Sequence, residues 1–343
     1  MLAVNVRVRG PLVAKSRSIT GEVKKFFCLD RKEKIFVAFQ PLSVRQSAKI
    51  LMEQFRKEFR MTQKKNKLSS LLVALVLVLS SSPLLVQAIT NGFPDTTNTF
   101  SNVGTVLAVG TDGQAFQLCS GTLISPTVFL TVAHCALYFN DFLAPQGFTL
   151  YMSFRNPTAF LELTDVNTLI PVTQIIPNPN YVQATDTHPF NPHHGSDPGD
   201  LAVIILPLSV TQGITPAALP TLGLLDELAV KNGLHGVLFT SVGYGSEDRF
   251  GNRSNPIPRM FAFSAFRALE PGFLQLSINP NLNNGGACFG DSGGPDFLPV
   301  KGKLILMAIA SVGGDLVCRA TSGNYRLDTA TARDFLMNFV TLP

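Results

Sequence analysis

The chain has 343 residues, 45% of them hydrophobic, with 27 glycines and 23 prolines, and shows neither repeats nor low-complexity tracts. This suits a turn-rich globular protein of one large or two ordinary domains. The net charge of +5 conceals two unlike parts, because residues 1–67 hold 17 of the 28 basic residues and 5 of the 23 acidic ones. Residues 68–343 are therefore acidic, and the basic balance gives no reason to expect a nucleic-acid partner.

Residues 1–60 form a basic N-terminal extension without clean periodicity. The extension could be a cytoplasmic tail, a disordered arm, or sequence upstream of the true start codon. Residues 61–88 have the features of a secretory signal peptide, since basic Gln63–Lys67 precedes the nine apolar residues Leu71–Leu79 and small residues end at Ala88. We expect cleavage there and a secreted protein, extracellular or periplasmic.

A permanent membrane anchor is the alternative interpretation of the apolar run. A spanning helix needs about 20 predominantly apolar residues, and Ser80–Pro83 interrupts this run. We therefore expect no stable membrane association after cleavage.

From Ile89 onward, short apolar runs alternate with turn residues, as in β-strands. The predicted strands are Val103–Val109, Gln117–Ile124, Val128–Val132, Phe148–Phe154, Ile170–Ile176, Leu201–Leu206, Gly236–Val242, Met260–Phe266, Phe273–Ile278, Leu304–Val312 and Tyr325–Asp328. Residues 207–224 are rich in Pro, Gly and Thr and separate two sets of strands. Residues 329–340 have apolar positions at helical spacing and predict a C-terminal helix. Many short strands with one terminal helix indicate an all-β fold of paired antiparallel barrels.

The chain has five cysteines, and four of them remain if the N-terminal part with Cys28 is removed. An even set suits an oxidising compartment, although free buried thiols are the alternative. Four cysteines allow three pairings. We favour Cys119–Cys135 and Cys288–Cys318, because each pair brackets one of the sequence motifs described next.

Three motifs carry side chains suited to nucleophilic catalysis. His134 follows an apolar strand and could be a general base, although a lone histidine there is more often structural. Asp200 lies at the mouth of the apolar segment Leu201–Leu206, where a carboxylate needs a partner unless it is a solvated turn residue. Ser292 lies among glycines in Gly290–Pro295, where a tight turn could expose its hydroxyl and direct backbone N–H groups at one oxygen. A glycine-rich surface turn is the alternative.

Thr131–Cys135, Asp200–Val203 and Gly290–Pro295 occur in the order His, Asp, Ser, and together they resemble the trypsin/chymotrypsin family of serine endopeptidases. The resemblance extends from Ile89 to the C-terminus. It implies two packed six-stranded antiparallel barrels, the first at about 89–206 and the second at about 225–328, within a protease domain 89–343. It also implies Ser292 as nucleophile, His134 as base and Asp200 as the residue that orients the imidazole.

The same resemblance assigns further roles to residues near the nucleophile. The N–H groups of Gly290 and Ser292 would form the oxyanion hole. Ile89, freed by signal cleavage, would pair its new ammonium group with Asp291 and so activate the enzyme. The substrate pocket would be lined by glycines and small residues: Gly286, Ser311, Val312, Gly313 and Gly323. Such an open, uncharged pocket implies a preference for aromatic or large aliphatic side chains and poor cleavage after Lys or Arg.

Some residues depart from the family pattern. The chain has no tryptophan, so Tyr244 stands between Gly243 and Gly245 where an indole is usual, and Asp296 replaces an apolar residue. The histidines at 188, 193 and 194 could suggest a metal site, but a solvated loop is the better explanation, so we expect neither metal nor cofactor.

The sequence therefore predicts a secreted, monomeric serine endopeptidase acting on proteins or peptides. Two alternatives remain open: a non-catalytic homologue that serves as a binding module, and a membrane-anchored protease.

Overall fold

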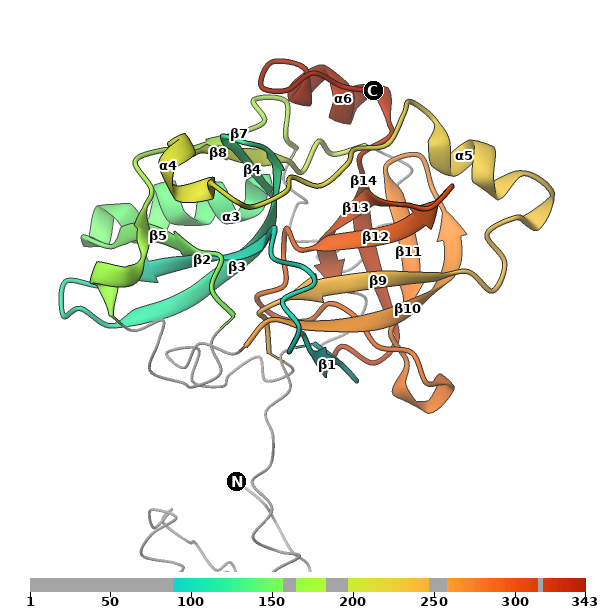
Figure 1. Ribbon diagram of the computed structural model, residues 1–343, viewed down its shortest axis with the longest axis horizontal. Helices are drawn as coiled ribbons and strands as arrows, with labels where there is room; N and C mark the ends of the chain where they lie inside the picture. Colours follow the sequence, from blue (N-terminus) through green and yellow to red (C-terminus); the bar gives the residue numbers. More distant parts are fainter. Residues whose placement is uncertain (1–88, 157–164, 183–196, 247–257, 314–316) are drawn as a thin grey trace, which may run out of the picture. The chain divides into compact units, whose positions relative to one another are not determined.

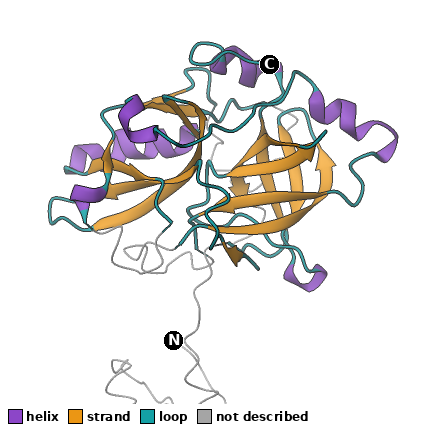
Figure 2. Cartoon of the chain, in the orientation of Figure 1, coloured by secondary structure: helices purple, strands orange, loops and turns teal. Residues whose placement is uncertain are grey.

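A computed structural model describes residues 89–156, 165–182, 197–246, 258–313 and 317–343. The predicted extension 1–60 and signal peptide 61–88 lie outside these ranges, as do the three histidines at 188, 193 and 194. The described residues form two antiparallel sheets joined by loops and a few short helices (Figure 1, Figure 2). None of the helices in these ranges is long and apolar enough to cross a membrane.

The first sheet has seven strands in the order β6-β5-β2-β3-β4-β8-β7. Its strands are β2 (Val103–Val109), β3 (Ala115–Ser125), β4 (Val128–Thr131), β5 (Thr149–Ser153), β6 (Ile170–Pro171), β7 (Ile175–Pro177) and β8 (Ala202–Ile205). All seven residues of β2 and all four of β4 are buried, because their side chains face either the interior of the curled sheet or the neighbouring elements. Within the described ranges the edge strands β6 and β7 do not pair, so this sheet is a curled half-barrel where a closed six-stranded barrel was expected.

The second sheet contains a closed barrel. Its strands are β1 (Phe93–Pro94), β9 (Leu238–Gly243), β10 (Met260–Leu269), β11 (Phe273–Ser277), β12 (Pro295–Val300), β13 (Lys303–Gly313) and β14 (Thr321–Arg326). The order β10-β11-β14-β13-β12-β9 returns to β10 through the β9–β10 pairing, and β1 pairs with the first two residues of β10. The prediction of an all-β fold built from antiparallel barrels is confirmed, and this ring has the expected six strands.

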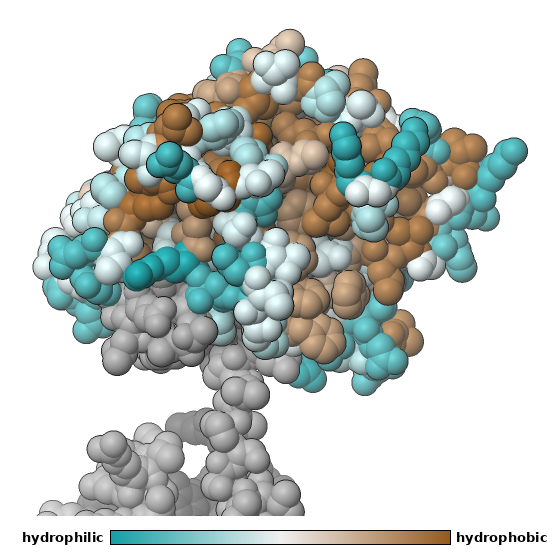
Figure 3. All heavy atoms as spheres, viewed as in Figure 1, coloured by the Kyte–Doolittle hydropathy of each residue, from teal (hydrophilic) through white to brown (hydrophobic). Residues whose placement is uncertain are grey.

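Short helices lie at the ends and on the outside of the sheets. They are α3 (Ala133–Tyr138), α4 (Leu208–Thr211), α5 (Leu224–Ala229) and α6 (Ala330–Leu336), with 3-10 or π turns at Phe139–Leu143, Ala144–Gln146, Val166–Thr168, Val230–Asn232 and Pro280–Leu282. Helix α5 buries Leu225 against the core of the second barrel. Figure 3 shows apolar residues gathered on the surface of the second barrel below this helix.

The predicted C-terminal helix is present but shorter than residues 329–340. Thr329 caps the start of α6 by accepting a hydrogen bond from the Ala332 N–H. The helix ends at Leu336, and the chain then turns so that the ring of Phe339 packs on Phe335 with centroids 5.2 Å apart.

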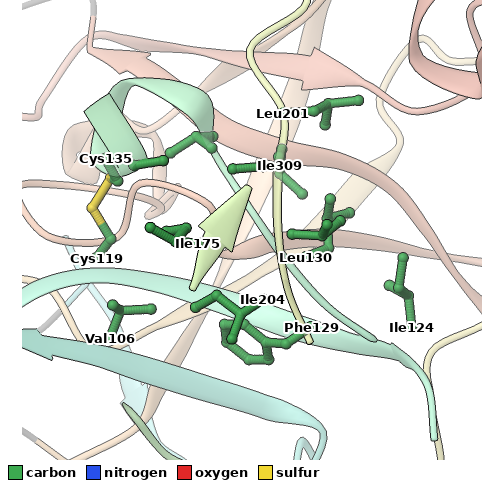
Figure 4. Close-up of a cluster of buried hydrophobic side chains, with 14 of the residues drawn as sticks. Val106, Cys119, Ile124, Phe129, Leu130, Cys135, Ile175, Leu201, Ile204 and Ile309 are labelled. Carbon is green, nitrogen blue, oxygen red and sulfur yellow. A yellow bond between two sulfur atoms is a disulfide. The ribbon is translucent and has the colours of Figure 1, made fainter. Parts of the chain in front are cut away.

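One continuous apolar core connects the two sheets. Val106, Phe129 and Leu130 from the first sheet belong to the same buried cluster as Phe297 and Ile309 from the second. Figure 4 shows part of this cluster beside the Cys119–Cys135 disulfide. Because the sheets share this core, residues on loops at their junction are held in fixed relative positions.

The N-terminal segment joins the second barrel although residues 89–206 were assigned to the first. Strand β1 pairs with β10. Just beyond it, buried Asp95 makes an ion pair of 2.9 Å with Arg259, whose side chain is 0% exposed. Arg259 also donates to the hydroxyl oxygen of Tyr244 at 3.0 Å. The segment is thus fastened to the second barrel by buried polar contacts as well as by strand pairing.

Candidate active site

His134 lies in the first turn of α3, directly after strand β4. Its backbone N–H donates to Asp200 Oδ1 at 3.0 Å, and its ring Nδ1 lies 2.9 Å from Asp200 Oδ2. These two contacts fix both the position and the orientation of the imidazole. The hydrogen bond at Nδ1 sets the neutral tautomer, in which Nε2 carries a lone pair that can accept a proton.

Asp200 is buried at the start of the segment that leads into β8, which pairs with β4. Ser311 donates a third hydrogen bond to its Oδ2 at 2.6 Å. Burial by itself would raise the pKa of Asp200, but attraction to His134 and these hydrogen bonds outweigh it and lower the pKa. Burial likewise opposes protonation of His134, and the facing Asp200 carboxylate raises its pKa overall. The pair is therefore built to carry a positive charge on the imidazole.

Ser292 lies in a tight turn between the two sheets. Its carbonyl accepts from the Ser120 N–H at 2.9 Å, and the N–H of Gly293 donates to Ala310 O at 2.7 Å. Gly293 has φ +83°, and a Cβ there would lie 2.4 Å from Ser120 O, so only glycine allows this close approach. The Ser292 side chain remains half-buried, and in the described ranges no hydrogen bond joins it to His134.

Two backbone N–H groups at the nucleophile, those of Gly290 and Ser292, make no hydrogen bond to the described residues. The carbonyl of Phe289 accepts from the Ser246 N–H, and the carbonyl of Asp291 accepts from the Gly294 N–H, each at 2.7 Å. In a trans peptide the N–H points opposite to the carbonyl. The N–H groups of Gly290 and Ser292 therefore point away from these interior donors, and neither finds an acceptor in the part of the chain that the structure describes.

A cavity of about 330 Å³ brings these groups together. Its lining includes His134, Ser292, Gly290 and both disulfides, with residues from each sheet. Three of the predicted pocket residues, Ser311, Val312 and Gly313, line it too. A larger and more open hollow beside α6, about 700 Å³, contains none of the predicted functional residues.

Two predicted pocket glycines do not line the cavity. Gly323 is replaced in the lining by its neighbours Ser322 and Asn324, because successive residues of β14 face opposite sides of the sheet. Gly286 lies behind the wall, where it exchanges two backbone hydrogen bonds of 3.0 Å with Thr90. The resemblance thus pointed to this segment of the chain but not to Ser322 and Asn324, the two residues of it that line the cavity.

Asp291, beside the nucleophile, is fully buried. Its oxygens accept from the N–H groups of Gly245 at 2.7 Å and Cys288 at 2.8 Å. A Cβ on Gly243 or Gly245 would lie within 2.6 Å of this carboxylate, which explains why glycines flank Tyr244. Burial raises the pKa of Asp291 to about 7, and among the described residues no basic side chain pairs with it.

A second buried carboxyl lies in the same barrel. Asp296 on β12 accepts a hydrogen bond from Ser241 through Oδ1, and its Oδ2 has no partner among the described residues. Burial raises its pKa to about 7, and the charge of Asp291 contributes to the increase. The sequence marked Asp296 as an unusual residue for this position, but no sequence feature indicated that Oδ2 would lack a partner.

The structure contains two disulfides, Cys119–Cys135 and Cys288–Cys318. The first ties the start of α3, and hence His134, to β3. The second ties the segment before Ser292 to the segment before β14. No group of three metal-ligating side chains occurs in the ranges that the structure covers, and the histidines at 188, 193 and 194 lie outside them.

Comparison with known proteins identifies one matching family model and several relatives. The Trypsin family model matches residues 89–332. CLIP domain-containing serine protease B15 of Anopheles gambiae is 29% identical over 210 residues, covering 57% of this chain and 54% of that protein. Limulus clotting factor C of Carcinoscorpius rotundicauda is 25% identical over 228 residues, covering 59% of this chain and 20% of that protein. The chain thus spans about half, or less, of the curated relatives that it matches.

Proposed function

This chain belongs to the trypsin family of serine proteases, and we propose on that basis that it is an exported serine endopeptidase that cleaves proteins or peptides. The observation that carries the proposal is the meeting of three groups at one cavity: His134, which is hydrogen-bonded to buried Asp200, the Ser292 residue, and the N–H groups of Gly290 and Ser292, which have no acceptor among the described residues. Each is needed for acyl transfer, and a binding module would have no reason to keep them together.

The chemistry follows from the roles of these groups. Ser292 Oγ attacks the carbonyl carbon of the substrate while His134 Nε2 accepts its proton. The charge that develops on the carbonyl oxygen is stabilised by the N–H groups of Gly290 and Ser292. His134 then gives the proton to the leaving amine, and water releases the acyl group from Ser292 by the same steps in reverse. Asp200 holds the imidazole and stabilises its cation.

Activation by a new N-terminus is part of the proposal. Ile89 is 0% exposed and packs against Met260 and Ala262, while the next residue, Thr90, is paired with Gly286. Asp291, one residue before the nucleophile, is buried without a cationic partner among the described residues, a costly state for a carboxylate. Cleavage before Ile89 would supply an ammonium group to pair with Asp291 and would fix the turn that carries Gly290 and Ser292.

Export is supported by the two disulfides, which persist in oxidising compartments. The uncharged lining of the cavity, His134 apart, supports a preference for apolar or aromatic side chains next to the cleaved bond. We further propose that the mature protein is monomeric and has no stable attachment to the membrane.

The test is the intact mass of the exported protein before and after reaction with a fluorophosphonate. We expect a mass that begins at Ile89 with two disulfides, and one covalent adduct that Ser292→Ala abolishes. The right mass without an adduct would favour a non-catalytic homologue. A mass that includes residues 61–88 would favour a membrane-anchored protein and would contradict activation by signal cleavage.

A further inference from the structure

The lining of the active-site cavity includes an unusual polar group. Asn324, on β14, is 0% exposed and lines the cavity together with Ser322. Its Oδ1 atom is buried and has no hydrogen-bond partner in the described part of the chain. A buried carbonyl oxygen that lacks a donor is uncommon, because native proteins satisfy nearly all such groups.

The orientation of the Asn324 amide is fixed by its neighbours. Its Nδ2 lies 3.1 Å from the carbonyl oxygen of Leu274 and 3.4 Å from that of Ser322. Carbonyl oxygens only accept hydrogen bonds, so nitrogen and not oxygen must face them. The unpaired Oδ1 is therefore a real property of this site and does not depend on an arbitrary choice between the two ends of the amide.

The distance between Asn324 and the nucleophile turn suits a long substrate side chain. Ala310 on β13 exchanges hydrogen bonds of 2.7 and 2.8 Å with Gly293 and Gly294, which directly follow Ser292. On its other side Ala310 is paired with Asn324. Two neighbouring strand spacings separate the nucleophile turn from Asn324, roughly 10 Å between backbones. A long side chain whose carbonyl is held at Ser292 can extend over that distance.

We propose that Asn324 selects substrates whose side chain is apolar along its length and ends in an uncharged hydrogen-bond donor, with tyrosine favoured over phenylalanine before the cleaved bond. This inference rests on the proposed endopeptidase function. The lining of the cavity also includes Ile278, Ala310 and Val312, whose apolar side chains suit an aromatic ring. The tyrosine hydroxyl would then donate to Asn324 Oδ1.

A charged side chain is disfavoured at the same position. The cavity lining contains no carboxylate among the described residues. The ammonium group of lysine could donate to Asn324, but its charge would remain buried without a counter-ion. Phenylalanine fills the same space but leaves Oδ1 unpaired. Tyrosine alone of these three satisfies both the apolar wall and the acceptor.

The experiment compares capped peptide amides that differ only in Tyr, Phe or Lys before the cleaved bond. We expect kcat/KM to be about two- to tenfold higher for Tyr than for Phe, the range of one neutral hydrogen bond. In Asn324→Leu the ratio should fall to about one. Asn284→Leu is the matched control, because Asn284 is also a buried asparagine of this region, bonded to Ser277, but does not line the cavity. The Asn284→Leu variant should keep the Tyr/Phe ratio of the unmutated protein.

A Tyr/Phe ratio at or below one in the unmutated protein, a ratio unchanged in Asn324→Leu, or Lys as the best substrate would overturn the inference. If Asn324→Leu does not fold, the ratios of the unmutated protein still decide. Absence of both turnover and a fluorophosphonate adduct would instead refute the proposed function. Binding of the Tyr and Phe peptides to Ser292→Ala would then test the pocket alone: tighter binding of Tyr supports the inference, and equal binding overturns it.

Discussion

Replacing Asp296 by asparagine should make the stability of this protein less dependent on pH. Asp296 is 1% exposed and has one oxygen without a partner among the described residues. Burial raises its pKa from 3.8 to about 7, so the folded protein holds this proton more tightly than the unfolded chain does. The stabilisation is therefore complete below about pH 4 and is lost as the pH rises towards 7. The amide introduced by Asp296→Asn would keep an acceptor for Ser241 without ionising.

The size of the effect follows from the pKa. Each pH unit between the two pKa values changes the free energy of unfolding by about 1.4 kcal/mol. Between pH 5 and pH 8 the unmutated protein should lose about 3 kcal/mol through Asp296, because the loss ends near pH 7. For a domain of this size, 1 kcal/mol corresponds to about 2 °C in Tm. The Tm of Asp296→Asn should therefore rise by about 6 °C relative to the unmutated protein over this interval.

Differential scanning calorimetry from pH 5 to pH 8 measures this directly. Both proteins should carry Ser292→Ala, which prevents self-digestion. Asp334→Asn, at an exposed position, controls for the loss of one negative charge. Parallel Tm curves for the unmutated protein and Asp296→Asn would refute the reasoning, since Asp296 would then ionise equally in both states.

Other substitutions test individual contacts. Ser311→Ala removes the 2.6 Å hydrogen bond to Asp200, and we expect kcat to fall about tenfold, as for one hydrogen bond to a charged group; an unchanged kcat on an amide substrate would contradict this. Cys119→Ser with Cys135→Ser opens a disulfide that spans 16 residues, and denaturant unfolding should show a loss of about 3 kcal/mol, whereas an unchanged midpoint would argue against it. Arg259→Met leaves a buried carboxylate unpaired and should lower stability by about 3–5 kcal/mol in the same assay, so a loss below about 1 kcal/mol would exclude a structural role for the ion pair.

The strands that form the active-site junction could be predicted because they are long and apolar. Val103–Val109 was predicted with its observed bounds. Strand β12 was missed, since Pro295, Asp296 and Pro299 disfavour a strand in isolation. In the structure Pro295 is the first residue of β12, and β9 pairs with only Asp296 and Phe297, so neither proline removes a hydrogen bond to β9.

The sequence pattern could not predict which side chains of β14 face the pocket. Thr321, Ser322, Gly323 and Asn324 have the composition of a turn, and the strand was predicted to begin only at Tyr325. Their strand conformation depends on pairing with β11 and β13 on both sides. Local propensity cannot report these tertiary contacts. His134, Asp200 and Ser292 could be proposed as site residues from the sequence because each lies in a local motif. The position of Asn324 in the cavity lining, by contrast, depends on the strands that pair with β14.

The attachment of the N-terminal segment to the second barrel has a consequence for biosynthesis. The ion-pair partner of Asp95 is Arg259, which is synthesised 164 residues later, and Thr90 donates to the carbonyl of Cys318, 228 residues later. At about 5–20 residues per second, a ribosome needs roughly ten seconds to a minute to supply these partners. During that interval Thr90 and Asp95 lack these partners. The proposed cleavage before Ile89 would fall within this interval, before the C-terminal strands are complete.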